Sequence, residues 1–123
     1  MLVVVHGTTR RRAERILAQG PDPDFIEPNG TKASGFSTYL EQGPFPFGAP
    51  DEYARAKANA FPDEDGPAIL RVDVPDEIIA LATDDVYFPL SQGLVQFDPG
   101  AGLEELRTAW PSLTKRIILL ELP

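Results

Sequence analysis

The first apolar run of the chain ends in a short polar corner. Residues 2–5 are leucine and three valines, the pattern of a strand that is buried on both faces. His6, Gly7 and Thr8 follow directly, and His6 is the only histidine of the sequence. A titratable ring followed by glycine at the end of a strand is typical of a ligand-contacting position. We therefore look for function first at this corner.

An amphipathic helix is predicted after the corner. Thr8 or Thr9 can cap its first turn, its apolar side chains recur at helical spacing up to residue 17, and Gly20 followed by proline ends it. Residues 10–12 are all arginine and are expected to form a solvated face. They lie about one turn from the polar corner, so a contact with a phosphate group also stays open.

The middle of the chain alternates irregular and regular segments. Residues 21–34 favour turns, and residues 43–48 interleave glycine, proline and phenylalanine. Between them, residues 35–40 alternate apolar and small polar side chains, which predicts a short strand. Residues 49–61 carry alanine and phenylalanine at helical spacing after an early proline and two acidic residues, which predicts a second helix.

The second half of the chain reads mostly as strands. Strands are expected at residues 68–74, 86–88, 94–97 and 116–122, a turn of helix at residues 76–80, and an amphipathic helix at residues 102–110. Helices early and strands late predict an α+β architecture.

Composition narrows the class of protein. A chain of 123 residues with 42% hydrophobic residues fits one domain spanning residues 1–123. The absence of cysteine excludes zinc fingers and thiol catalysis. A net charge of -8 disfavours nucleic acid and anionic membranes as partners, since both need a basic surface. No segment has the length of a signal peptide core or of a membrane span, so we expect a cytoplasmic protein.

Two other kinds of site are disfavoured by local context. The acidic residues 63–65 lie between Pro62 and Gly66, which indicates a turn, and they lack the spacing of a calcium loop. The serines lack the context of a nucleophile elbow, and no phosphate-binding glycine loop with a lysine is present. Neither a metal site nor a serine triad is therefore expected.

The order of these elements resembles the ADP-ribosyltransferase superfamily, in the branch of diphtheria toxin and the poly(ADP-ribose) polymerases. The first motif of that branch, His-Gly-Ser/Thr, is matched by His6-Gly7-Thr8, and its Ile-Leu-x-x-Gly helix end is matched by residues 16–20. The resemblance implies a split β-sheet cleft with short helices. It also implies NAD as the bound substrate.

The second motif of that branch, Gly-hydrophobic-Tyr, is matched in part. Gly35 and Phe36 fit the first two positions, whereas Ser37 stands where the tyrosine usually falls. Tyr39, two residues later, lies on the same face of the expected strand and can substitute for that tyrosine.

The resemblance assigns roles to residues of the expected cleft. The backbone of Gly7 is expected to hold the nicotinamide amide, because a side chain there would block close approach. His6 is expected to donate to the adenosine ribose hydroxyl. An aromatic ring stacks on the nicotinamide in this family, a role open to Tyr39, Phe36 or Tyr53.

The third motif of that branch is a glutamate that opens a late strand, and no acidic residue stands there. Gln92 is the first candidate for this catalytic position and Gln96 the second. Cleavage of the glycosidic bond builds positive charge on the ribose, which a carboxylate stabilises. A glutamine can hydrogen-bond the ribose hydroxyl but supplies no charge. Polymer formation is therefore not expected.

The leading interpretation is a mono-ADP-ribosyltransferase that moves ADP-ribose from NAD to a macromolecular acceptor which the sequence leaves unspecified, as in bacterial toxins and modifying enzymes. A catalytically inactive NAD-binding or ADP-ribose-binding or protein-interaction module of the same fold is the alternative. A third possibility is a partner-binding protein that exposes the proline- and phenylalanine-rich residues 43–48.

Overall fold

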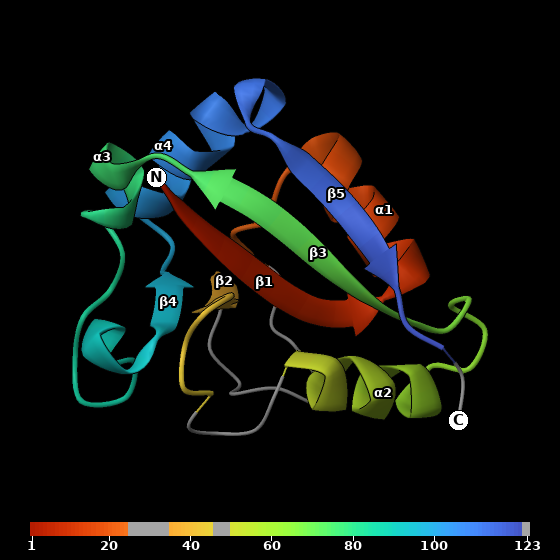
Figure 1. The fold of residues 1–123 in the computed structure, drawn as a ribbon. Helices are drawn as coiled ribbons and strands as arrows, with labels where there is room; N and C mark the ends of the chain where they lie inside the picture. The colour runs from red at the N-terminus through yellow and green to blue at the C-terminus, as the bar shows by residue number, and fades with distance from the viewer. Residues whose placement is uncertain (25–34, 46–49, 122–123) are drawn as a thin grey trace.

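The computed structural model describes residues 1–24, 35–45 and 50–121, which form a small α+β domain around a single antiparallel sheet (Figure 1). The sheet has five strands in the order β4-β2-β1-β3-β5. Their bounds are β1 Leu2–Thr9, β2 Phe36–Leu40, β3 Pro67–Val74, β4 Leu94–Phe97 and β5 Lys115–Leu119.

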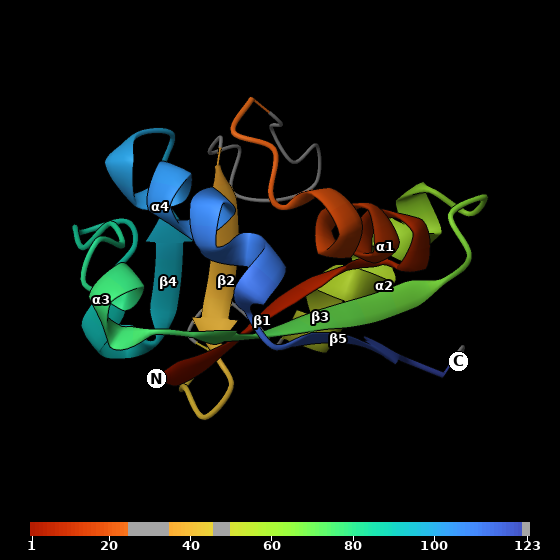
Figure 2. The same cartoon turned by 90° about the horizontal axis from the view of Figure 1, so that it is seen from above.

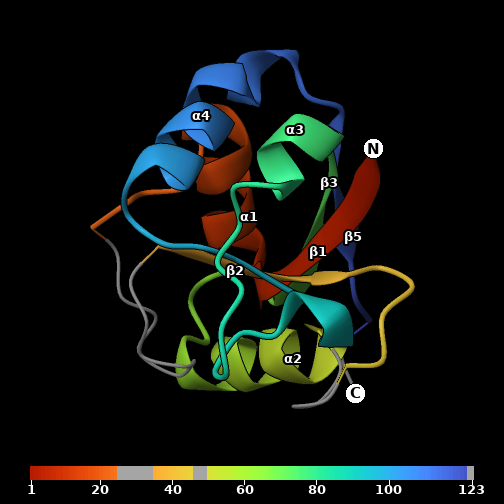
Figure 3. The ribbon, with the colours of Figure 1, turned by 90° about the vertical axis from the view of Figure 1, so that its left-hand side faces the viewer.

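Helices cover both faces of this sheet. On one face lie α1 (Arg10–Gln19), α3 (Asp76–Ile79) and α4 (Ala101–Ala109), and on the other lies α2 (Pro50–Ala60) (Figure 3). Two short 3-10 turns, η1 (Leu90–Gln92) and η2 (Trp110–Ser112), precede β4 and β5. Of the helices in the described ranges, none is long and apolar enough to cross a membrane.

The apolar interior is divided by the sheet into two unequal parts. Val4 of β1 belongs to the larger cluster, with the inward faces of α1, α3 and α4 and with Trp110. Val5 points the other way, into a small cluster with Ala54 of α2 and Ile69 of β3. Because successive residues of a strand face opposite sides, both faces of β1 are buried. This explains its unbroken apolar run.

The structure extends the first expected strand and joins the expected sheets. β1 continues to Thr9 because it pairs with β3 along all eight of its residues, including the polar corner. The split cleft implied two separate sheets, and this expectation is wrong, because the described strands form one sheet. The expected helices are present, and so are three of the four strands expected in the second half of the chain. Their boundaries are shifted by at most three residues.

The strand expected at residues 86–88 is also wrong. The Asp85 carboxylate accepts hydrogen bonds from the backbone amides of Tyr87 at 2.9 Å and Phe88 at 2.8 Å. An aspartate that bonds the backbone two and three residues ahead stabilises a turn in place of a strand. The apolar side chains of Val86 and Tyr87 are consequently exposed.

Much of the two irregular segments of the sequence lies outside the description. Residues 25–34 of the first and 46–49 of the second are not described. The exposed loop of the third possibility, residues 43–48, is therefore described only as far as Phe45. That side chain is partly buried, with its ring centroid 5.8 Å from the ring of Tyr39.

Candidate functional site

A cavity of about 150 Å³ lies where β1 and β2 separate. The two strands pair only at Val4 with Leu40 and at Val5 with Tyr39. From Phe36 to Tyr39, β2 pairs with β4 on its other side. Figure 2 shows β2 and β4 running steeply across the direction of β1 and β3. The second half of β1 is therefore left without β2 as a neighbour, and the cavity occupies this wedge.

Every residue expected to bind NAD lines this cavity. Three separate segments contribute these residues, namely β1, β2 with the glycine before it, and α2, while α1 supplies a further wall. The lining includes His6, Gly7, Thr8, Gly35, Phe36, Tyr39 and Tyr53. The order of motifs thus brings these residues together in space. That they bind NAD stays a prediction.

The ring of His6 is neutral and presents an acceptor. Its Nδ1 lies 2.7 Å from the carbonyl oxygen of Ser37. A carbonyl only accepts, so Nδ1 carries the proton. Burial, reinforced by the nearby charge of Lys57, lowers the pKa of His6 to about 3. The other ring nitrogen, Nε2, therefore has no proton at neutral pH. In this state Nε2 can accept from a ribose hydroxyl, whereas donation from His6 to that hydroxyl in a complex stays a prediction.

Gly7 allows α2 to approach the sheet. A Cβ atom at this position would lie 2.0 Å from the carbonyl oxygen of Pro50 and 3.2 Å from the amide nitrogen of Ala54. The carbonyl oxygen of Gly7 accepts a hydrogen bond from Lys57 Nζ at 2.6 Å. Packing alone thus requires a glycine here. The expected contact between the Gly7 backbone and a nicotinamide amide stays a separate prediction, because the packing of the fold neither depends on this contact nor prevents it.

The aromatic candidates lie on two sides of the cavity. The rings of Tyr39 and Tyr53 are stacked with their centroids 6.1 Å apart. Burial, together with the hydrogen bond to Tyr53, raises the pKa of Tyr39, so its hydroxyl stays protonated. Phe36 instead packs between His6, at 4.8 Å, and Trp110, at 6.0 Å. Because both neighbours already cover Phe36, the tyrosines are the better platform for a ligand ring.

The cavity is cationic in an acidic protein. Arg12 and Arg15 of α1 and Lys57 of α2 line it, and Asp22 is the carboxylate among its described lining residues. Lys57 is only 4% exposed. Sequence reasoning did not single out Lys57, although its spacing of three residues from buried Ala54 places both on one face of the helix. That spacing is the signal that could have found it.

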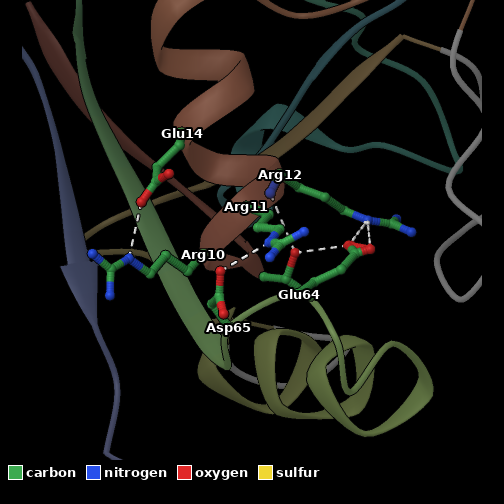
Figure 4. Close-up of polar contacts among 7 residues, drawn as sticks. Arg10, Arg11, Arg12, Glu14, Glu64 and Asp65 are labelled. Atoms are coloured by element: carbon green, nitrogen blue, oxygen red, sulfur yellow. Dashed lines mark hydrogen bonds and ion pairs between the residues drawn. The ribbon is translucent and has the colours of Figure 1, made fainter.

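Arg12 departs from the solvated face expected of the arginine run (Figure 4). Its guanidinium pairs with Glu64 at 2.6 Å and lies 4.1 Å from the ring centre of Phe61. Burial opposes ionisation of Glu64, but hydrogen bonds from Arg12 and Thr9 outweigh it and hold the pKa of Glu64 below its usual value. The acidic turn therefore fastens α1 to the end of α2.

The other two arginines behave as expected of a solvated face. Arg10 pairs with Glu14 at 2.9 Å and Arg11 with Asp65 at 2.8 Å, and all four side chains are about half exposed. Thr9 caps α1, because its hydroxyl accepts from the amide of Arg12 at 3.3 Å.

The hydroxyl of Thr8 is buried and has no hydrogen-bond partner in the described part of the protein. Thr8 also lines the cavity. A buried hydroxyl without a partner is costly.

The two glutamines proposed for the catalytic position lie outside the described cavity lining. Gln92 is exposed in η1. Gln96 of β4 is 0% exposed and lies directly opposite Ser37 of β2, whose hydroxyl donates to the Gln96 side-chain oxygen. Gln96 therefore contacts the cavity wall through Ser37, and it is the better placed of the two.

These groups give the cavity three kinds of contact for a ligand: cationic side chains, a stacked aromatic pair, and the neutral acceptor of His6. Such a set can bind a molecule that combines an anionic group, an aromatic ring and hydroxyls. Comparisons of the chain with protein-family models, with curated proteins and with solved structures find no match.

Proposed function

We propose that the cavity between β1 and β2 binds NAD, and that the chain is a mono-ADP-ribosyltransferase with a fold related to that family. The observation that carries the proposal is the convergence of the motif residues. His6, Gly7 and Thr8 of the first motif and Gly35 and Phe36 of the second line one cavity, although about 30 residues separate them in the chain.

The chemistry of the cavity fits the parts of NAD. The pyrophosphate is anionic and matches Arg12, Arg15 and Lys57. The ribose hydroxyls are donors and match His6 Nε2. A cavity of about 150 Å³ accepts one aromatic ring, and the stacked pair of Tyr39 and Tyr53 supplies a platform for it.

Transfer of ADP-ribose requires stabilisation of positive charge on the ribose. Gln96 is held against Ser37 and can orient a hydroxyl of the ligand through Ser37. Asp22, the carboxylate among the described lining residues, is exposed. A neutral residue at the catalytic position predicts slow transfer.

A second candidate function is binding of NAD or ADP-ribose without transfer. The observation that favours it is the neutral and fully buried state of Gln96, since an amide supplies no charge to an oxocarbenium-like transition state. Turnover distinguishes the two candidates.

The test measures binding and turnover on the same preparation. NAD affinity is measured by calorimetry, and nicotinamide release is followed with time. We expect Arg15→Ala to weaken NAD binding about tenfold, the usual effect of losing one charge-assisted contact. Arg10→Ala is the matched control, because it removes the same charge from the same helix outside the described cavity lining.

The outcomes separate the hypotheses. Binding with nicotinamide release that His6→Ala abolishes supports the transferase, and binding without release supports the second candidate. If neither NAD nor ADP-ribose binds at millimolar concentration, both candidate functions fail.

A further inference from the structure

A chain of side-chain hydrogen bonds runs from the cavity wall to the surface. Ser37 Oγ donates to Gln96 Oε1, and Gln96 Nε2 donates to Asp98 Oδ1 at 3.0 Å. The second carboxylate oxygen of Asp98 accepts from Thr83 Oγ1 at 2.6 Å. Gln96 is 0% exposed, whereas Asp98 lies at the surface. The inner end of the chain is therefore shielded, and its outer end is a charged group.

The Asp98 carboxylate favours one orientation of the Gln96 amide. A carboxylate only accepts, so the amide nitrogen of Gln96 must face it and the amide oxygen must face Ser37. The single hydroxyl hydrogen of Ser37 is then committed to Gln96. Ser37 Oγ has only lone pairs left for a ligand in the cavity that it lines.

His6 likewise presents a hydrogen-bond acceptor to the cavity, next to Ser37. Its Nδ1–H is committed to the carbonyl of Ser37, and its Nε2 is an acceptor because the ring is neutral. Ser37 is thus held through both its carbonyl and its hydroxyl. Both His6 and Ser37 offer acceptors, although cationic side chains line the same cavity.

We propose that Asp98 is a positioning residue that acts through Gln96 and makes the Ser37 hydroxyl a hydrogen-bond acceptor toward the cavity. This part of the cavity wall then selects a neutral hydrogen-bond donor of the ligand, a carboxamide or a hydroxyl, over a carboxylate. The inference rests on the proposed function, because it takes the carboxamide of NAD as this donor. An anionic group beside the Ser37 acceptor would leave that acceptor unpaired. The arginines and Lys57 then serve the anionic part of the ligand.

A matched pair of small probes tests this selection on the full chain. Nicotinamide and nicotinate share one ring and differ in carrying a carboxamide or a carboxylate. Net attraction to the cavity cations alone would favour nicotinate. We expect nicotinamide to bind about tenfold more tightly at pH 7, measured by ligand-observed NMR titration. Ser37→Ala should reduce this preference.

Variants of Asp98 test the hydrogen-bond chain itself. In Asp98→Lys the ammonium group donates, so the Gln96 oxygen turns toward it, the amide nitrogen faces Ser37, and the Ser37 hydrogen becomes available to the cavity. The preference for nicotinamide should then be lost. Asp98→Asn keeps an acceptor oxygen and should retain the preference. Glu105→Lys, at an exposed position of α4, makes the same change of charge away from the chain and should also retain it.

Equal or tighter binding of nicotinate to the unaltered protein would overturn the inference, as would binding of neither probe at millimolar concentration. A preference that survives Asp98→Lys would overturn the role of Asp98. Selective nicotinamide binding without NAD binding would support the inference and contradict the proposed function. Near-ultraviolet circular dichroism confirms the fold of each variant.

Discussion

Stability of the protein should depend on pH through His6. The unfolded chain binds a proton at this ring below pH about 6.5, its ordinary pKa, whereas burial lowers the pKa of the folded state to about 3. Between these values the unfolded state holds the extra proton, so acid favours unfolding. The contribution of His6 to stability is complete above pH 6.5 and is lost as the pH falls toward 3.

The magnitude follows from the two pKa values of the ring. Each pH unit within this window changes the free energy of unfolding by about 1.4 kcal/mol. From pH 7 to pH 5, the folded ring stays neutral and the unfolded ring becomes charged. The expected loss of stability is then about 2 kcal/mol. This value requires only that the folded pKa lie well below 5.

The assay is urea unfolding at pH 7, 6 and 5, with the His6→Gln variant beside the original chain. Glutamine does not titrate, and its amide can donate to the carbonyl of Ser37 in place of Nδ1. The difference in slope between the two proteins therefore isolates the ring. Equal slopes over this range, or an imidazole that titrates near pH 6.5 by NMR, would refute the neutral buried His6.

Two further predictions concern packing. Gly7→Ala should displace α2 from the sheet and lower the free energy of unfolding by at least about 2 kcal/mol, because the new Cβ would lie 2.0 Å from the Pro50 carbonyl oxygen. An unchanged chemical denaturation midpoint would contradict this packing. Glu64→Gln should cost roughly 1 to 3 kcal/mol at pH 7, because it removes the negative charge that pairs with the partly buried guanidinium of Arg12. The neighbouring Asp65→Asn change, at a half-exposed pair, should cost clearly less in the same thermal and urea melts, and an equal loss would remove the distinction.

Secondary structure was predictable wherever the local pattern agreed with the tertiary environment. The helix that ends at Gly20 had an apolar face, a cap and a glycine stop, and these signals lie within the segment itself. The strand expected at residues 86–88 failed because the side chain of Asp85 competes for the backbone amides that a ladder would need. Apolar composition alone does not register such competition.

The residues that line the candidate site were largely predictable, whereas their protonation and hydrogen bonding were less so. The order of motifs indicated His6, Gly7 and the residues around Phe36, and the cavity contains them. The tautomer of His6 was not predictable, because it depends on the carbonyl of Ser37 across the wedge. Lys57 was missed because a lysine on an alanine-rich helix reads as a solvated residue.

The sequence by itself determined the α+β class and the helix boundaries, because caps, stops and apolar periodicity act over a few neighbouring residues. It also placed the only histidine at the polar corner of β1. The tertiary structure alone decided that β1 and β2 separate after Val5, that Lys57 lies beneath Gly7, and that Gln96 lies opposite Ser37. These contacts join residues about 30 to 60 positions apart, and the charge and hydrogen-bond polarity of the cavity arise from them. Protonation and hydrogen bonding respond to the groups within a few ångströms, which only the fold brings together.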